Sequence, residues 1–99
     1  MLVKFRSKKW RNIYDNRHKG DRELGEQVAR KYHQRVSILE EVDSINKLCL
    51  QHPNLHCHKL TGDRKGQWAL NLKDQWRLIF SYDETTKTVT IEEVSNHYD

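Results

Sequence analysis

The sequence has few of the residues that interrupt a compact domain. It contains one proline and four glycines in 99 residues, and it has no repeat, low-complexity run or Gly/Ser-rich stretch. Interdomain linkers are rich in such residues, so their scarcity predicts a single domain over residues 1–99. A chain of this length supplies one hydrophobic core and leaves no room for a separate cofactor module. We therefore expect one small site and no cofactor.

Cysteines and long apolar runs are also scarce. The two cysteines, Cys49 and Cys57, do not have the spacing of a disulfide framework, so we interpret them as reduced thiols that are buried or idle. No window approaches the roughly 18 consecutive apolar residues that a membrane span needs, and the first residues carry charges where a signal peptide is apolar. The sequence predicts a cytoplasmic protein without a membrane partner.

Charge is distributed unevenly along the chain. The net charge is +4, but residues 1–35 hold eleven Lys/Arg and four Asp/Glu, a balance of +7, and residues 55–77 hold five against two, a balance of +3. Residues 36–54 and 78–99 are acidic, at −2 and −4. Two basic segments that meet on one surface would attract a polyanion, of which nucleic acid is the commonest. A solvated helical face is the alternative interpretation of the same pattern.

The first half of the chain has the period of helices after a short strand. Residues 2–6 alternate like a strand, and Ser7 is a plausible N-cap for a helix with a stripe at Trp10, Ile13 and Tyr14. The run 19–21, Lys-Gly-Asp, is expected to end that helix, and Asp21 to cap a longer one that extends to about Val42. Residues 44–50 predict one more short helix. The stripe of the long helix comprises Leu24, Val28, Tyr32, Val36 and Leu39.

The second half has the period of strands. Residues 68–72, 76–82 and 88–94 read as strands joined by tight turns, and residues 55–60 as the strand before them. The whole predicts an α+β fold, in which an N-terminal strand and two to three helices pack on one face of a mainly antiparallel sheet of four to five strands.

Candidate catalytic residues gather around the predicted outer face of this sheet. If Trp76, Leu78 and Phe80 point at the helices, Arg77 must point away from them. Near it in sequence lie His58, the Gly-rich loop 61–66 and the chain end 95–98. Metal-free RNA cleavage needs a base, an acid and cations that stabilise charge on the phosphate. The candidates are Arg77, His58, His97 and Tyr98 for catalysis, and Arg64, Lys65, Lys59 and Lys73 for RNA or phosphate binding.

The segment CHKLTGDRKGQWALNLKDQWRLIFSYDE, residues 57–84, together with the terminal SNHYD, resembles the HigB branch of the RelE/ParE toxin superfamily. In that branch a histidine, a Gly-Asp-Arg loop, a Trp/Leu strand, an aromatic-Arg strand and a short His/Tyr-containing tail occur in this order. The resemblance is close over these residues, whereas the first half matches only in layout. Two positions depart from the family pattern. Ser95 and Asn96 stand where relatives have Asp-Tyr, so Tyr98 is the candidate replacement, and Thr61 stands where some relatives have lysine.

The resemblance implies the toxin of a type II toxin–antitoxin system, an endoribonuclease that cuts mRNA, usually in the ribosomal A site. It implies that His58, Arg77 and His97 are functional residues. It also implies a helix-turn-helix antitoxin that holds the toxin in a complex, which we expect to be heterotetrameric. We expect the ribose 2′-oxygen to attack the adjacent phosphate without a metal. The two histidines share the roles of base and acid, since both protonation states exist near neutral pH, and the sequence does not assign them.

Several alternatives remain open on the residues alone. Arg77 could form a cross-strand ion pair with Glu92 or Glu93. His56 and His58 could share a strand face and bind zinc, although no second Cys/His pair completes four ligands. The rival functions are a ParE-like toxin that acts on a topoisomerase, and an RNA-binding module without catalysis.

Overall fold

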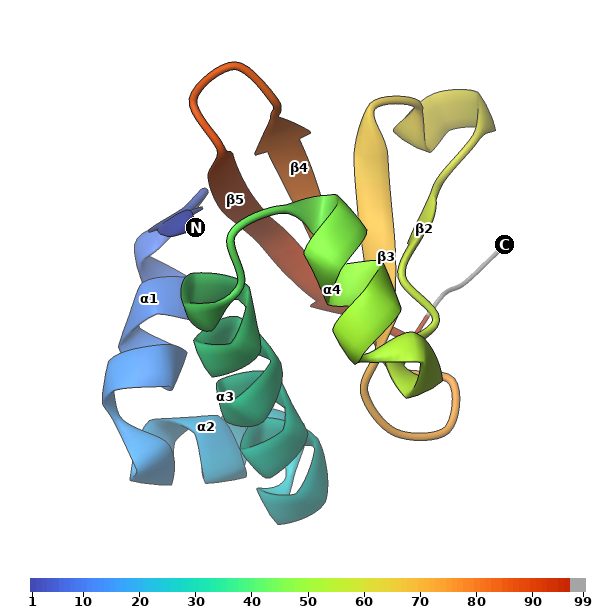
Figure 1. Cartoon of the computed structure of the whole chain (residues 1–99). Coiled ribbons are helices and arrows are strands. Elements are labelled where there is room, and N and C mark those ends of the chain that lie inside the picture. Colours follow the sequence, from blue (N-terminus) through green and yellow to red (C-terminus); the bar gives the residue numbers. More distant parts are fainter. Residues whose placement is uncertain (97–99) are drawn as a thin grey trace.

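The computed structural model describes residues 1–96, and Figure 1 shows the order of their helices and strands. The strands are β1 (Leu2–Phe5), β2 (His58–Lys59), β3 (Gln67–Asn71), β4 (Arg77–Asp83) and β5 (Thr88–Ser95). The helices are α1 (Lys8–Asp15), α2 (Arg17–Leu24), α3 (Glu26–Glu41) and α4 (Ile45–Gln51), with two 3-10 turns, η1 (Pro53–Leu55) and η2 (Gly62–Arg64). None of the helices within this range has the length and apolar character needed to cross a bilayer.

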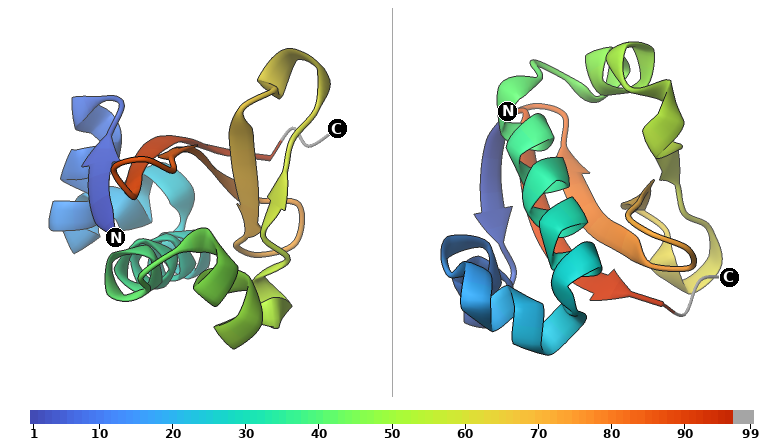
Figure 2. Two further views of the ribbon diagram at one scale, coloured as in Figure 1. Left: turned by 45° about the horizontal axis from the view of Figure 1, so that its top comes forward. Right: turned by 90° about the horizontal axis from the view of Figure 1, so that it is seen from below.

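The strands of residues 1–96 form one five-stranded sheet in the order β1-β5-β4-β3-β2. β1 runs parallel to β5, and the other neighbours are antiparallel. The N-terminal strand therefore lies at one edge of the sheet and β2 at the other, as the two views of Figure 2 show. The predicted α+β class and the mainly antiparallel sheet with an N-terminal strand are confirmed.

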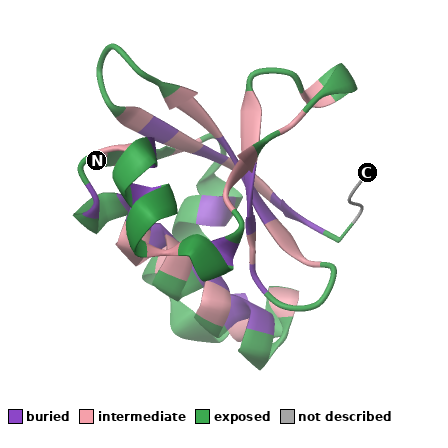
Figure 3. Cartoon of the chain, turned by 45° about the vertical axis from the view of Figure 1, so that its right-hand side comes forward, coloured by how far each residue is buried: buried purple, intermediate pink, exposed green. Residues whose placement is uncertain are grey.

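The helices cover one face of the sheet and enclose the core against it. In Figure 1, α4 lies in front of the strands, and the right-hand view of Figure 2 shows α3 lying across them. Figure 3 shows that the buried residues follow the strands and the inner sides of the helices. The hydroxyl of Tyr32 satisfies its hydrogen bond inside this core by donating to the carbonyl of Trp10 at 2.8 Å. The completely buried members of the core cluster come from both layers: Tyr32, Val36, Leu39, Leu48, Leu70, Leu78, Phe80, Val89 and Ile91.

The prediction that residues 19–21 end the first helix is wrong. They lie inside α2, and the break comes earlier at Asn16, whose side chain accepts a hydrogen bond from the backbone N–H of Lys19 at 3.3 Å. Position 20 favours glycine because the neighbouring helices leave little room for a side chain. A Cβ on it would lie 3.2 Å from Cγ2 of Ile13 and 3.3 Å from Cβ of Ala29. The glycine lets α2 approach α1 and α3 closely, so it acts through packing and not as a helix breaker.

The long helix also begins later than predicted. Asp21 was expected to cap it, but Asp21 lies within α2, and Gly25 separates α2 from α3 with a φ of 83°. Positive φ is favourable for glycine, so the chain can turn sharply here. The region predicted as one helix over residues 21–42 is therefore two helices. Within residues 1–96 the chain has four α-helices, one more than the predicted upper number.

Two strand predictions extend beyond the observed strands. Of residues 55–60 only His58 and Lys59 are in a strand, because Leu55 lies in η1 and His56 adopts the left-handed conformation with φ 51° and ψ 47°. Trp76 was expected to begin a strand. It lies in the loop between β3 and β4, where its N–H donates to the carbonyl of Lys73 at 2.8 Å.

Candidate active site

Strand pairing sorts the side chains of β4 onto two faces. Leu78 and Phe80 lie in the core cluster beneath the helices. Side chains alternate along a strand, so Arg77 and Ser81 lie on the opposite side of the sheet, which we call the outer face. Arg77 is half-buried there, and its pairing partner on β5 is Ser95.

β2 adds His58 to the outer face. His58 pairs with Ala69 across β2 and β3. Ala69 in turn pairs with Ile79 on β4, and Ile79 pairs with Glu93 on β5, so one row of residues crosses the sheet. Arg77 lies two residues from this row. Standard strand spacings place the backbones of His58 and Arg77 about 12 Å apart.

The imidazole of His58 is oriented by the backbone two residues before it. Its Nδ1 lies 2.7 Å from the carbonyl oxygen of His56. A carbonyl can only accept, so Nδ1 carries the hydrogen in this contact. In the neutral ring Nε2 is then the acceptor nitrogen, which is the form that a general base requires.

The guanidinium of Arg77 bends toward the loop before β4. Its Nη1 donates to the carbonyl of Asp74 at 2.6 Å and to that of Trp76 at 3.0 Å. Asp74 has a φ of 53°, in the left-handed region. The cation is thus held at the end of the sheet where β4 begins.

Arg64 from η2 lies across the outer face. Its Nη1 donates to Oε1 of Gln67 on β3 at 3.2 Å, and its Nη2 to Oε2 of Glu93 on β5 at 3.3 Å. Because β4 runs between these two strands, the guanidinium lies over β4 near Ile79. Ile79 is only 2% exposed although it points away from the helices, so this part of the outer face is covered. The Gly-Asp-Arg loop is therefore folded onto the same face as Arg77 and His58.

A β-bulge in β5 places two consecutive carboxylates on the outer face. The register shifts between Ile79 and Phe80, which pair with Glu93 and Ile91. Glu92 is the additional residue. Since Ile91 and Val94 on either side belong to the core cluster, both Glu92 and Glu93 lie on the other side of the sheet.

Arg6, which is not among the residues predicted from the sequence, pairs with one of these carboxylates. Its Nε and Nη2 donate to the two oxygens of Glu92 at 3.0 and 2.8 Å, and the hydroxyl of Ser81 donates to Glu92 at 2.6 Å. The hydrogen bond from Arg6 holds the pKa of Glu92 below its ordinary value and outweighs the opposing effect of burial. The signal that could have found Arg6 is its place directly after β1. Its use depends on the parallel pairing of β1 with β5, which the sequence pattern does not show.

The three predicted phosphate-binding lysines are not gathered at the outer face. Lys65 is exposed at the end of η2, next to Arg64. Lys59 pairs with Trp68 and so lies on the helix side of the sheet, with Nζ 5.4 Å from the centre of the Trp68 ring. Lys73 donates to Oε1 of Gln27 at the beginning of α3. Lys59 and Lys73 are therefore separated from His58 and Arg77.

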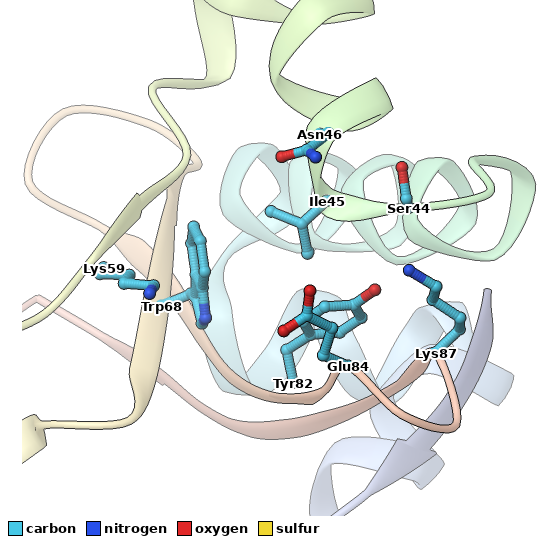
Figure 4. A pocket seen from close by; sticks show the side chains of 8 residues that line it. All are labelled: Ser44, Ile45, Asn46, Lys59, Trp68, Tyr82, Glu84 and Lys87. Atoms are coloured by element: carbon cyan, nitrogen blue, oxygen red, sulfur yellow. The ribbon is translucent and has the colours of Figure 1, made fainter.

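A pocket of about 180 Å³ lies on the helix side of the sheet, between the beginning of α4 and strands β2 to β4 with the β4–β5 turn. Figure 4 shows Lys87 and Glu84 from the turn reaching toward it, with Ile45 above Tyr82. The complete lining is Ser44, Ile45, Asn46, Lys59, Trp68, Tyr82, Glu84 and Lys87. Because Lys59 and Trp68 point to this side, the pocket is separate from the outer face.

The chain leaves the sheet beside Arg77. Ser95, the last residue of β5, is the pairing partner of Arg77 and is 8% exposed, and Asn96 after it is exposed. The predicted catalytic residues His97 and Tyr98 lie outside the described residues.

The sequence also raised a zinc site at His56 and His58, and it predicted that Cys49 and Cys57 are reduced thiols. Within residues 1–96, no three His, Cys, Asp or Glu side chains are grouped so that they could hold a metal ion. Both cysteines are free thiols. Cys49 is exposed rather than buried, and Cys57 is half-buried. Burial, with a smaller effect of the neighbouring Cys49, raises the pKa of Cys57 to about 12, so this thiol stays protonated at neutral pH.

Comparison with known proteins gives one family and several similar folds. A family model described as the RelE-like toxin of the type II toxin–antitoxin system HigB matches residues 3–97. No curated protein sequence matches the chain.

Three solved structures show the similarity of fold. The YoeB/ParE toxin from Agrobacterium tumefaciens has a TM-score of 0.60 at 13% identity, over 99% of this chain and 100% of that one. YafQ from Escherichia coli has a TM-score of 0.59 at 18% identity, over 94% and 89%. A chain of the YoeB–YefM complex from Staphylococcus aureus has a TM-score of 0.55 at 14% identity, over 99% of each chain. The RelE-like form of the predicted fold is therefore confirmed.

Proposed function

Because the chain belongs to the HigB-like toxins, the RelE-like toxins of type II toxin–antitoxin systems, we propose that it is an endoribonuclease that cuts mRNA without a metal ion. The observation that carries the proposal is the position of Arg77, His58 and Arg64 on one face of the sheet. These are the residue types that phosphodiester cleavage by a ribose hydroxyl requires.

The proposed reaction begins with removal of the proton from the ribose 2′-hydroxyl. The 2′-oxygen attacks the adjacent phosphorus, the bond to the 5′-oxygen breaks, and an acid protonates this leaving oxygen. The products are a 2′,3′-cyclic phosphate, or a 3′-phosphate after hydrolysis, and a 5′-hydroxyl. His58 and His97 are the base and acid candidates, with Tyr98 as a further proton donor.

Arg77 is proposed to stabilise the additional negative charge on the phosphate during the attack. Preorganised cations are effective in this role because they do not have to reorient as charge develops. The two carbonyl contacts of Arg77 support preorganisation, since they fix the guanidinium at the beginning of β4. His97 follows Ser95, the last residue of β5, by two positions in the sequence.

Arg64 and Lys65 are proposed to bind the RNA backbone, because both are carried by the loop that leads to the outer face. Lys59 and Lys73 are no longer proposed for this role. Their side chains are engaged on the helix side by Trp68 and Gln27.

The proposed partners are mRNA in the ribosomal A site and a helix-turn-helix antitoxin of the HigA kind, in the cytoplasm. One structure with the same fold is described as a heterotetrameric YoeB–YefM toxin–antitoxin complex. A heterotetramer is the proposed assembly for this toxin too. The cations of the outer face can be silenced by an acidic segment that covers them.

The experiment is translation of a defined mRNA in vitro with purified protein. We expect the wild type to shorten the mRNA and Arg77→Ala to lower the rate roughly 100- to 1,000-fold, as for loss of one preorganised charge-stabilising group. Lys73→Ala is the matched control, since it removes a cation on the other side of the sheet and should cut like the wild type.

Two outcomes would contradict the proposal. Intact mRNA with accumulating DNA breaks would favour a ParE-like toxin that acts on a topoisomerase. RNA that is bound but not cut would favour a binding module without catalysis.

A further inference from the structure

Three residues other than glycine have a positive φ within residues 1–96. They are His56 at 51°, Asp74 at 53° and Lys87 at 55°. L-residues rarely adopt this conformation, and such backbone strain tends to occur at functional sites. Each of the three positions therefore needs a structural reason.

His56 turns the chain between η1 and β2. Its own N–H donates to the carbonyl of Pro53 at 3.2 Å, which closes the 3-10 turn. Its left-handed conformation then directs its carbonyl at the ring of His58, 2.7 Å from Nδ1. The turn and the imidazole contact thus depend on the same backbone conformation.

Asp74 likewise combines a left-handed backbone with a carbonyl that contacts a proposed catalytic side chain, that of Arg77. It lies in the loop between β3 and β4, which is closed by hydrogen bonds from the N–H of Leu72 to Trp76 at 3.0 Å and from the N–H of Trp76 to Lys73 at 2.8 Å. Its carbonyl points out of this loop and accepts from Nη1 of Arg77 at 2.6 Å.

Lys87 has a different explanation. It ends the turn between β4 and β5, where the side chain of Asp83 accepts hydrogen bonds from the N–H groups of Thr85 and Thr86 at 3.0 and 3.3 Å. A residue with positive φ is a common requirement of short hairpin turns. The left-handed residue here closes a hairpin and is remote from the outer face.

We propose that the left-handed backbone at His56 and Asp74 positions the two catalytic side chains through its carbonyls. The carbonyl of His56 holds the hydrogen on Nδ1 of His58, so that Nε2 accepts the proton of the ribose hydroxyl. The carbonyl of Asp74 fixes the guanidinium of Arg77. The inference rests on the proposed function and deepens it, because it assigns His58 as the base. His56 and Asp74 are positioning residues and do not touch the RNA themselves.

The first test measures the tautomer of His58 directly by ¹⁵N NMR of the imidazole nitrogens, at a pH where the ring is neutral. His58→Gln assigns the signals by their disappearance. We expect hydrogen on Nδ1 in the wild type and in His56→Gly, because glycine keeps a positive φ without strain. In His56→Val, whose β-branched side chain disfavours this backbone, we expect Nε2–H to become the main form.

The second test measures mRNA cutting. We expect His56→Val and Asp74→Val to cut roughly 10- to 100-fold more slowly, as for a small misplacement of a reacting group. His56→Gly and Asp74→Gly should cut like the wild type. Lys87→Val is the matched control, since it places the same strain at a left-handed residue away from the site, and it should also cut like the wild type.

The outcomes separate this inference from the proposed function. Hydrogen on Nε2 of His58 in the wild type would overturn the assignment, whether or not His56→Val folds. A loss of cutting in Lys87→Val equal to that in His56→Val would also overturn it, because strain alone would then explain the effect. If the wild type cuts no RNA, the proposed function fails, while the NMR measurement still decides how His58 is held.

Discussion

The helix face and the outer face of the sheet are made by the same strands but held by different contacts. On the helix face, Leu78 and Phe80 are completely buried among side chains from α3 and α4. On the outer face, Glu92 and Glu93 of β5 are held by arginines from outside the strands, Arg6 after β1 and Arg64 in η2. Apolar burial dominates the free energy of folding, whereas ion pairs with exposed members contribute little. The comparison therefore assigns most of the stability to the helix face and leaves the outer face for the proposed chemistry.

The largest expected effect tests the difference in stability between the two faces with substitutions at two neighbouring residues of β4. Phe80→Ala should lower the free energy of unfolding by about 3–5 kcal/mol, since it leaves a cavity in the core. Ser81→Ala removes one hydrogen bond to Glu92 and should cost about 1–2 kcal/mol. Urea unfolding of both variants measures the difference. Equal losses would show that the outer face carries as much of the stability as the core.

The second comparison concerns two cations on opposite faces. Arg64→Ala should reduce mRNA cutting roughly 100-fold, because it removes a fixed positive charge from the outer face. Lys59→Ala should leave cutting unchanged, because Lys59 lies over Trp68 on the helix side. Initial rates of mRNA cutting during translation in vitro measure both. If the two variants lose the same activity, cutting depends on the total positive charge of the protein and not on the face that carries it. The division into two faces would then be wrong.

The acid sensitivity of stability should depend on the outer face. The folded pKa of Glu92 is lowered by Arg6, so its contribution to stability is complete above the unfolded pKa and is lost as the pH falls through the folded pKa. Glu92→Gln carries no charge at any pH, so its unfolding midpoint in urea should decline less steeply than that of the wild type below the ordinary glutamate range. Parallel curves for the two proteins would refute a role for this ion pair.

The smallest expected effect concerns RNA affinity. Lys65 is exposed, so Lys65→Ala should leave stability unchanged and lower the slope of log affinity against log salt by about 0.7, the value for one phosphate contact with a single strand. A 2′-O-methylated RNA allows binding to be measured without cleavage. Lys73→Ala should leave the slope unchanged. A lower slope in Lys73→Ala as well would mean that RNA also contacts the helix side.

The sequence pattern was sufficient for the features that depend on periodicity. The alternation of β4 predicted that Arg77 points away from the helices, because a buried Leu78 and Phe80 leave it no other side. The stripe through Tyr32 and Val36 likewise marked the core side of α3. These features are local, so a short stretch of residues contains the necessary information.

The features that the pattern missed depend on contacts between distant segments. Gly20 was taken for a helix breaker, whereas it is required by the close approach of Ile13 and Ala29. Arg6 and Glu92 are 86 residues apart and meet only because β1 pairs with β5. Lys59, a candidate for phosphate binding, is the exception, because the local alternation of β2 already places it on the opposite face from His58.

The central claim is that the outer face performs metal-free attack by a ribose hydroxyl on the adjacent phosphate. The most direct measurement is the chemistry of the RNA ends that the purified wild-type protein produces from a defined mRNA during translation in vitro. The account predicts 5′-hydroxyl ends together with 2′,3′-cyclic or 3′-phosphates. Fragments with 5′-phosphate and 3′-hydroxyl ends, which attack by a metal-activated water would leave, would contradict it.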